Sequence, residues 1–341
     1  MAYTTIKKPS DYFNTKTYSG NSSTQAITSV NFQPDFTWLK RRDQTSFHYL
    51  FDSIRGVQKR LSSNSDTTEA TVSTSLTSFD SDGFTLGSEG DVNESGGTYV
   101  GWNWLADNTS GSSNTDGSIT STVSANTTSG FSIVSYTGTG ANATVGHGLG
   151  VAPAMIMIKC RSRIEEWVVY NQAMGNAHAI PLNLTEAKST SATFWQDTNP
   201  SSSFFYIGAN NKHNQSGETF IAYCFAEKKG FSKFGSYTGN GNVDGTFVYT
   251  GFKPAFVMWK KTNGASEWIM VDSKRNTSNE VDKLLRANQS SAENTYGACD
   301  FLSNGWKFRD GDTDFQASGD TYIYMAFAEE PLVGDNPATA R

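Results

Sequence analysis

The chain has 341 residues, a net charge of −6 and a pI of about 5.3, which excludes the strongly basic surface that nucleic acids and anionic membranes attract. Hydrophobic residues make up only 36% of the sequence, whereas aromatic residues reach 13% and glycine occurs 31 times. Many aromatic residues, together with frequent Gly, Asn and Ser clusters, are typical of short strands joined by turns. We therefore predict an all-β protein with little helix.

The first segment, residues 1–13, reads MAYTTIKKPSDYF and precedes the first strand pattern. It has no apolar stretch of the signal-peptide type, and no window of the chain approaches the ~18 apolar residues of a membrane span. Four of its side chains, Tyr3, Ile6, Tyr12 and Phe13, are aromatic or aliphatic. We predict that this arm anchors the chain to a larger assembly, because a few such contacts can dock a short peptide.

Three apolar runs share one form, a proline followed by a strand that ends in lysine: NFQPDFTWLKR, LGVAPAMIMIKCR and GFKPAFVMWKK. Their prolines, Pro34, Pro153 and Pro254, are 119 and 101 residues apart. Two further sets of residues keep nearly the same spacing, namely Tyr18, Tyr136 and Tyr237 before the runs and Tyr99, Phe220 and Tyr322 in the closing strands. A period near 100 residues indicates a repeated unit of domain size rather than a solenoid.

The strand and turn signals inside each unit are those of a β-sandwich. FHYLFDS and SEWIMVDS alternate apolar and polar residues, and segments 79–87 and 301–309 are typical hairpins with Asp-Gly and Asn-Gly turns. Only 278–288 has a composition that suits a turn or two of helix. Each proline is expected at the first residue of its strand, where it costs no central ladder hydrogen bond.

We predict three tandem sandwiches of the jelly-roll or lectin-like type, over residues 14–106, 130–229 and 230–331. The Ser/Thr/Asn/Gly-rich segment 107–129 is expected to be a linker after the first sandwich. Residues 332–341 form a short tail.

An acid and an arginine recur at one place, as Asp52 and Arg55 in the first unit and Asp272 and Arg275 in the third. We predict structural ion pairs that tie a strand end to its loop, with ligand binding as the alternative. The second unit has Tyr-Asn-Gln-Ala from Tyr170 at this place, which argues against a shared active site.

Two acidic clusters place carboxylates at alternate positions, as calcium loops do, and they comprise Asp80 and Asp82, and Asp310, Asp312 and Asp314. No distal glutamate completes the loop pattern, so turn residues are the preferred interpretation and calcium is the alternative. The four histidines, His48, His147, His178 and His213, show no ligand spacing. No nucleophile or phosphate-loop motif is present. We expect a protein without cofactors or catalytic residues.

The cysteines and aromatic residues are interpreted as core. Cys160, Cys224 and Cys299 are far apart and odd in number, which suits buried free thiols in a reducing compartment. The 8 Trp and 14 Tyr residues could stack on sugars as in sandwich lectins, but most lie within alternating strand patterns, which favours the core.

Several phrases carry a family likeness: NFQPDFTWLKRR with HYLFDSIRG, TSFDSDGFTLGSEG, GFSIVSYTGTG with GHGLGVAPAMIMIK, and FIAYCFAEKKGFSKFGSYTGNG. From about Tyr18 to Glu329, the chain resembles a family of virion proteins from phages of marine bacteria, often labelled tail fibre or concanavalin-like. The resemblance implies lectin-like sandwich units and a structural or attachment role in the virion. It implies no catalytic residues.

The resulting hypothesis is a non-enzymatic bacteriophage virion protein, a tail-associated knob involved in host attachment. It would be assembled in the host cytoplasm, bind other virion proteins through the N-terminal arm, form a homo-oligomer and meet a host surface glycan. We expect no nucleic-acid partner and no membrane insertion. The alternatives are a capsid decoration protein on the head and, less favoured, a polysaccharide depolymerase with two carboxylates in a cleft.

Overall fold

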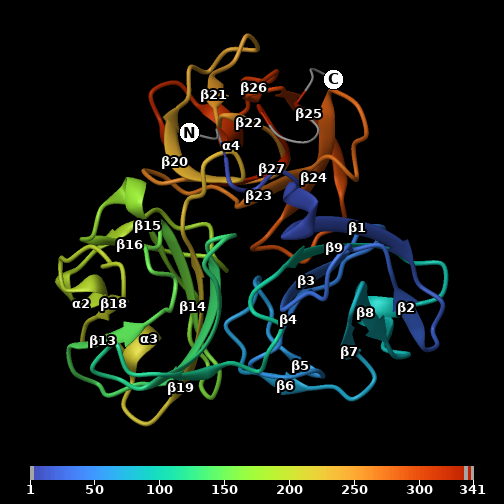
Figure 1. Cartoon of the computed structure of the whole chain (residues 1–341). Helices are drawn as coiled ribbons and strands as arrows, with labels where there is room; N and C mark the ends of the chain where they lie inside the picture. The colour runs from blue at the N-terminus through green and yellow to red at the C-terminus, as the bar shows by residue number, and fades with distance from the viewer. Residues whose placement is uncertain (1–3, 334–336, 339–341) are drawn as a thin grey trace.

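The computed structural model describes residues 4–333, 337 and 338, and the prediction of an all-β protein is confirmed. Every pair of named strands is antiparallel, and the α-helices in the described residues are four-residue turns. Figure 1 shows three lobes around a common centre, coloured blue to teal, green to yellow and orange to red along the chain. We call them units 1, 2 and 3.

Unit 1 follows a 3-10 turn, η1, at Pro9–Asp11. Its elements are β1 (Phe13–Ser19), β2 (Gln25–Ile27), β3 (Phe36–Arg41), β4 (His48–Asp52), β5 (Lys59–Arg60), β6 (Ala70–Thr71), β7 (Leu76–Asp80), β8 (Gly83–Leu86), α1 (Gly90–Asn93) and β9 (Thr98–Trp104).

Unit 2 has the same core elements and two additional strands at its start. Its elements are β10 (Ser112–Asn114), β11 (Ser121–Asn126), β12 (Phe131–Thr137), β13 (Ala143–Gly146), β14 (Met155–Cys160), β15 (Val168–Asn171), η2 (Gln172–Met174), β16 (His178–Pro181), β17 (Ser189–Thr190), α2 (Ala192–Trp195), β18 (Phe204–Ile207), α3 (Asn211–Asn214) and β19 (Thr219–Phe225).

Unit 3 ends the described fold. Its elements are β20 (Ser232–Thr238), β21 (Phe247–Tyr249), β22 (Phe252–Lys261), β23 (Ile269–Asp272), β24 (Val281–Arg286), β25 (Asn294–Leu302), β26 (Gly305–Phe308), α4 (Thr313–Gln316) and β27 (Thr321–Pro331). Segment 278–288, expected to form a turn of helix, contains strand β24 instead, because it pairs with β23 and β25.

The strand order of the central sheet repeats in all three units, as β1-β9-β3-β4, β12-β19-β14-β15 and β20-β27-β22-β23. The register repeats as well. The residue two positions after each proline lies opposite an aromatic residue of the closing strand, in the pairs Phe36–Trp104, Met155–Phe225 and Phe256–Phe327. The repeat in the sequence is therefore a repeat in the structure.

The prolines stand slightly differently from the expectation. Pro34 and Pro153 precede β3 and β14, whereas Pro254 lies inside β22, where the pairing with β27 shifts register. Proline is tolerated at such a bulge because the ladder is already interrupted.

The repeated tyrosines join the closing strand of each unit to the strand beside it, in the pairs β1 with β9, β12 with β19 and β20 with β27. Their rings stack on the closing-strand aromatics in the pairs Tyr18–Tyr99, Tyr136–Phe220 and Tyr237–Tyr322. Their hydroxyls donate to main-chain oxygens of the short helices, at Val92, His213 and Phe315. One residue thus fixes both a strand pair and a helix.

The expectation of a linker over 107–129 is wrong. Strands β10 and β11 lie in this segment, and β11 pairs with β12, so both belong to the sheet of unit 2. Ile119 and Val123 are buried in the core of that unit. Strand β11 has a polar composition because it lies at the edge of the sheet, where only one face of the strand contacts the core. The sequence of this segment is therefore similar to that of a linker.

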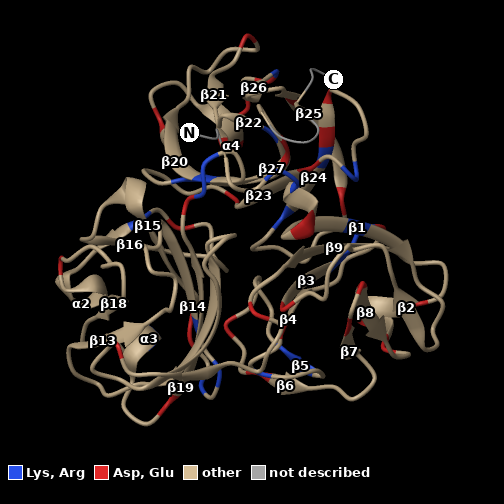
Figure 2. Ribbon diagram, viewed as in Figure 1, with Lys and Arg blue, Asp and Glu red and all other residues tan. Residues whose placement is uncertain are grey.

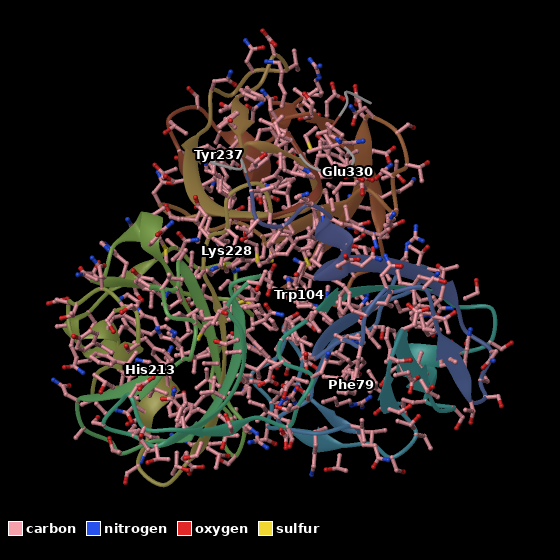
Figure 3. All side chains as sticks on the ribbon, in the orientation of Figure 1. Phe79, Trp104, His213, Lys228, Tyr237 and Glu330 are labelled. Atoms are coloured by element: carbon pink, nitrogen blue, oxygen red, sulfur yellow. The ribbon has the colours of Figure 1, made fainter. Side chains whose placement is uncertain are left out.

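The hydrophobic core has four parts. Each unit has its own cluster against its central sheet, and a fourth cluster lies where the three units meet. This central cluster has 34 buried residues, more than any other, and includes Trp104, Tyr223 and Phe256. Trp104 is labelled near the middle of Figure 3. The three units are therefore parts of one packed body.

No helix within residues 4–333 or at 337–338 is long and apolar enough to cross a membrane.

Candidate functional site

The lysines that end the proline-led strands lie in the seams between units. Lys159 Nζ donates to the main-chain oxygen of Asp66 at 3.0 Å, across the seam from unit 2 to unit 1. The equivalent bonds run from Lys260 to Thr185 at 3.2 Å and from Lys40 to Ser290 at 3.3 Å. Each lysine also donates to the main-chain oxygen of the residue that follows it. The three bonds close a ring in which every unit reaches the previous one.

Main-chain hydrogen bonds complete each seam in the same pattern. Glu69 N donates to Arg161 O and Glu165 N donates to Asp66 O between units 1 and 2. Between units 2 and 3, Lys188 N donates to Thr262 O and Ser266 N donates to Thr185 O. Between units 3 and 1, Glu293 N donates to Arg42 O and Ser46 N donates to Ser290 O. One loop of each unit, 62–69, 181–188 or 286–293, provides these contacts. The threefold arrangement is thus built from equivalent residues.

The predicted pair of Asp52 and Arg55 lies at the seam of units 1 and 2. Both side chains have no exposed surface, and they form an ion pair that also receives the Tyr223 hydroxyl, at 2.7 Å from Asp52. Arg55 further contacts Glu69, which binds Arg161 of unit 2 through two hydrogen bonds of 2.9 and 3.1 Å. Burial raises the pKa of Tyr223 well above its ordinary value, which keeps the hydroxyl protonated as a donor.

The pair of Asp272 and Arg275 has the same geometry at the seam of units 3 and 1. Arg275 Nε is 2.6 Å from Asp272, whose carboxylate also accepts from Trp102 Nε1 of unit 1 at 3.0 Å. Arg275 contacts Glu293 at 3.0 Å, and Glu293 binds Arg42 of unit 1 through two hydrogen bonds. The ion pairs therefore join units rather than only a strand end to its loop.

The third seam keeps the hydrogen bonds and lacks the charges. The residue at the place of the acid is Asn171 rather than Tyr170, because Asn171 pairs with Met155 as Asp52 pairs with Phe36. Thr262 stands in place of the bridging arginine, and Met325 stands in place of the donor aromatic residue. Trp268 Nε1 still donates to Pro181 O at 2.8 Å, as Trp167 does to Ser62 O at the first seam. The shared requirement is the lysine and main-chain pattern, and the salt bridges are an addition at two seams.

Burial shifts the protonation of these groups. It lowers the pKa of Lys40, Lys159 and Lys260 from 10.5 to about 8, because a charged ammonium is disfavoured away from water. In unit 1, burial raises the pKa of Asp35 to about 6, although Ala106 N and Asn108 N donate to its carboxylate. Through these two hydrogen bonds, Asp35, which directly precedes β3, connects β3 to the residues that follow β9.

The N-terminal arm contacts its own chain. Ile6 and Phe13 are 1% exposed and belong to the central cluster, Tyr12 packs against it, and Tyr3 lies outside the described residues. The prediction that Ile6 and Phe13 anchor the chain to a partner is wrong, because burying them in this core leaves no surface for another protein.

The carboxylates of the acidic clusters accept hydrogen bonds from main-chain N–H groups in turns. Asp82 accepts the main-chain N–H groups of Ser29 and Asn31, and these bonds lower the pKa of its carboxyl. Asp312 caps α4 through Asp314 N. Over residues 4–333, no three His, Cys, Asp or Glu side chains gather as they would around a metal ion.

All eight tryptophans are buried, so none presents a ring to a sugar. The aromatic residues that the described surface exposes by two-fifths or more are Phe47, Phe247, Tyr249 and Tyr296. Phe247 and Tyr249 alternate along β21, and the Lys233 ammonium lies 5.3 Å from the Tyr249 ring centre. Figure 2 shows acidic and basic residues on all three units.

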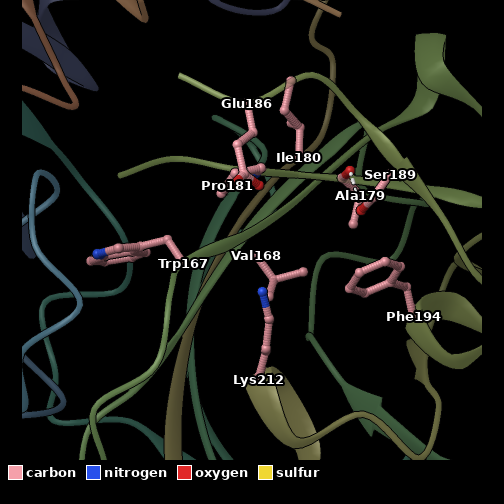
Figure 4. A pocket seen from close by; sticks show the side chains of 9 residues that line it. All are labelled: Trp167, Val168, Ala179, Ile180, Pro181, Glu186, Ser189, Phe194 and Lys212. Carbon is pink, nitrogen blue, oxygen red and sulfur yellow. Dashed lines mark hydrogen bonds between the residues drawn. The ribbon is translucent and has the colours of Figure 1, made fainter. Parts of the chain in front are cut away.

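Two hollows differ in size and lining. A small pocket of about 30 Å³ in unit 2 is lined by residues that include Trp167, Ile180, Phe194 and Lys212, all labelled in Figure 4. A polar groove of about 320 Å³ follows β1 in unit 1 and is lined by Asn14, Thr15, Lys16, Thr17, Ser29, Asn31 and Lys274.

Sequence patterns alone did not predict the side chains that bridge the seams, among them Glu69, Glu293, Arg42 and Arg161. A signal was present, because Arg42 and Arg161 keep the 119-residue spacing of the prolines. The buried position of the three lysines could not be predicted, since a lysine that ends an apolar strand is expected to reach solvent.

Comparison with known proteins gives one result. No curated protein and no solved structure matches the chain. A family described as a domain of unknown function (DUF7483) matches residues 8–331, which covers all three units and every seam. The chain therefore belongs to this family of unknown function.

Proposed function

We propose that the chain is a non-enzymatic structural protein of a bacteriophage virion, a tail-associated knob that takes part in host attachment. The observation that carries the proposal is the closed ring of three repeated units. The lysines at equivalent positions of the three units, Lys40, Lys159 and Lys260, each donate a hydrogen bond to the neighbouring unit and so hold the units together. Such a body has a shared core and contacts at every seam, which suits a compact knob. The resemblance of its sequence phrases to phage virion proteins gives the biological setting.

The surface available for attachment differs between units. Unit 3 carries the exposed pair Phe247 and Tyr249 on β21, with Lys233 beside Tyr249. Aromatic rings with a nearby polar group are the surface on which sugar rings stack, so this strand is the proposed place for a host glycan.

Mass spectrometry of purified phage particles tests the proposal. We expect a few to a few tens of copies per particle, and hundreds of copies would place the protein on the head as a decoration. Absence from purified particles would overturn the virion role. Incubation with host envelope glycan should release no reducing ends, whereas sustained release would show a depolymerase.

A further inference from the structure

The outer edge of β1 is an unpaired strand edge. In the ladder with β9, Leu105 N donates to Tyr12 O and Gly20 N donates to Gly97 O, so even-numbered residues of β1 face β9. The main-chain groups of Thr15 and Thr17 therefore point away from the sheet. Within the described residues, these groups have no hydrogen-bond partner, and the buried hydroxyl of Thr15 has none either.

Unit 2 shows what covers this edge when it is filled. The residues equivalent to Thr15 and Thr17, 118 positions later, are Ile133 and Ser135 of β12. They pair with Ser124 and Thr122 of β11. The fold thus already holds one antiparallel strand at this site, in the unit where the chain supplies it.

The residue that faces the sheet edge from the neighbouring unit is apolar where the edge is covered and charged where it is open. Ile54 lies against the filled site, because a Cβ atom at Gly111, just before β10, would be 3.1 Å from its Cδ1. Its equivalent in unit 3 is Lys274, which lines the open groove beside β1. In unit 3 itself, the corresponding edge of β20 is capped by Gln172, which donates to Phe234 O at 3.0 Å. Only the edge of β1 has neither a strand nor such a cap in the described part of the chain.

We propose that the edge of β1 binds an extended peptide segment of a protein partner, which adds a strand antiparallel to β1. Main-chain pairing would provide the affinity, as in other cases of strand addition. The groove wall is held in place, because Asp82 fixes Ser29 and Asn31.

Charge selects the segment. In unit 2, Val123 of the added strand lies opposite Val134, whereas the residue at the place of Val134 in unit 1 is Lys16. Lys16 and Lys274 form no ion pair with any described residue, and both line the groove. Because opposite charges on facing strand positions attract, the partner segment carries a carboxylate opposite Lys16. The inference is independent of the virion role.

The test uses the full chain and a fluorescent peptide of residues 117–130 with the Val123→Asp change. We expect saturable binding by fluorescence polarisation, and slower amide hydrogen exchange in residues 13–19 but not in 131–137. N-methylation of the peptide at Ser124, whose N–H faces the edge, should weaken binding about tenfold, the effect of one lost hydrogen bond of about 1.4 kcal/mol. The matched control is N-methylation at the position of Val123, whose N–H faces away, and it should bind as the parent does.

A charge exchange gives a second readout. Lys16→Glu should abolish binding of the acidic peptide and restore binding of a peptide with Val123→Lys. The proposal is overturned if both N-methylated peptides bind equally, or if no saturable binding occurs up to about 1 mM peptide. Concentration-dependent dimerisation that Lys16→Glu removes would also overturn it, because the occupant would then be a second copy.

Discussion

At the residue scale, the seam lysines show how a strongly polar group can be structural. Each ammonium is buried at the end of a strand, and its protons are donated to main-chain oxygens on both sides of a seam. This arrangement is specific, because no apolar side chain could satisfy those oxygens. It is also costly, since burial disfavours the charged form.

The lysines predict a pH dependence of stability. Their pKa is about 8 in the folded chain and 10.5 in the unfolded chain, so between these values the unfolded chain binds more protons and stability rises with pH. We expect up to about 2 kcal/mol per lysine by pH 9.5. Urea unfolding at pH 7 and pH 9.5 measures it.

The lysine contribution is isolated by comparison. Burial raises the pKa of the Cys224 and Cys299 thiols, and above pH 9 this lowers the free energy of unfolding as the pH rises. The lysine contribution is therefore measured by comparing variants with the unchanged chain. Lys260→Met should remove about a third of the lysine part of the rise, because it removes one of three equivalent groups. Lys8→Met, at an exposed side chain, is the control. An unchanged pH slope in Lys260→Met would refute the assignment.

The buried ion pair of Asp272 and Arg275 at the seam of units 3 and 1 gives a second prediction. Asp272→Asn leaves the Arg275 charge buried with one carboxylate fewer, so we expect a loss of about 3–5 kcal/mol in the free energy of unfolding. Asp272→Asn combined with Arg275→Met should cost less than the sum of the single changes. Denaturant titration measures all three variants, with Asp11→Asn at an exposed pair as the control. Additive losses would mean that the two residues do not interact.

At the element scale, the N-terminal arm is part of the core of this chain. The arm enters the central cluster through Ile6 and Phe13, and η1 lies between these residues. Strand β1 follows directly and forms the edge of the central sheet of unit 1.

We predict that Ile6→Ala destabilises the fold by about 2–4 kcal/mol, because it leaves a cavity in the central cluster. Thr5→Ala, at the exposed neighbouring residue, should change the free energy of unfolding by less than about 0.5 kcal/mol. Thermal and urea unfolding of both variants provide the comparison. Equal stability of the two would show that the arm contributes nothing to folding.

At the scale of the whole molecule, the shared cluster determines how the chain unfolds. Each unit buries part of its central sheet against the other two, so a single unit would expose residues such as Trp104 or Phe256 to water. The closed ring also means that opening one seam weakens the other two.

We predict one cooperative unfolding transition for the full chain, with equal calorimetric and van't Hoff enthalpies. A fragment of residues 230–331 should lack a cooperative transition of its own, because its share of the central cluster is uncovered. Scanning calorimetry of both, with circular dichroism of the fragment, measures this. Three separate transitions, or a fragment as stable as the chain, would contradict the shared core.

The sequence by itself determined the all-β class, the threefold repeat and the hairpins, because strand periodicity, turn residues and spacing are local properties of the chain. The same reason made two ion pairs predictable, Asp52 with Arg55 and Asp272 with Arg275, since the partners of each are three residues apart. Only the tertiary structure decided that the repeats close into a ring around a shared core. The bonds of Lys40, Lys159 and Lys260 join loops far away in the chain, and no local pattern encodes such contacts. The same holds for the strand in 107–129, whose polar residues form β11 only because the edge of β12 is there to pair with.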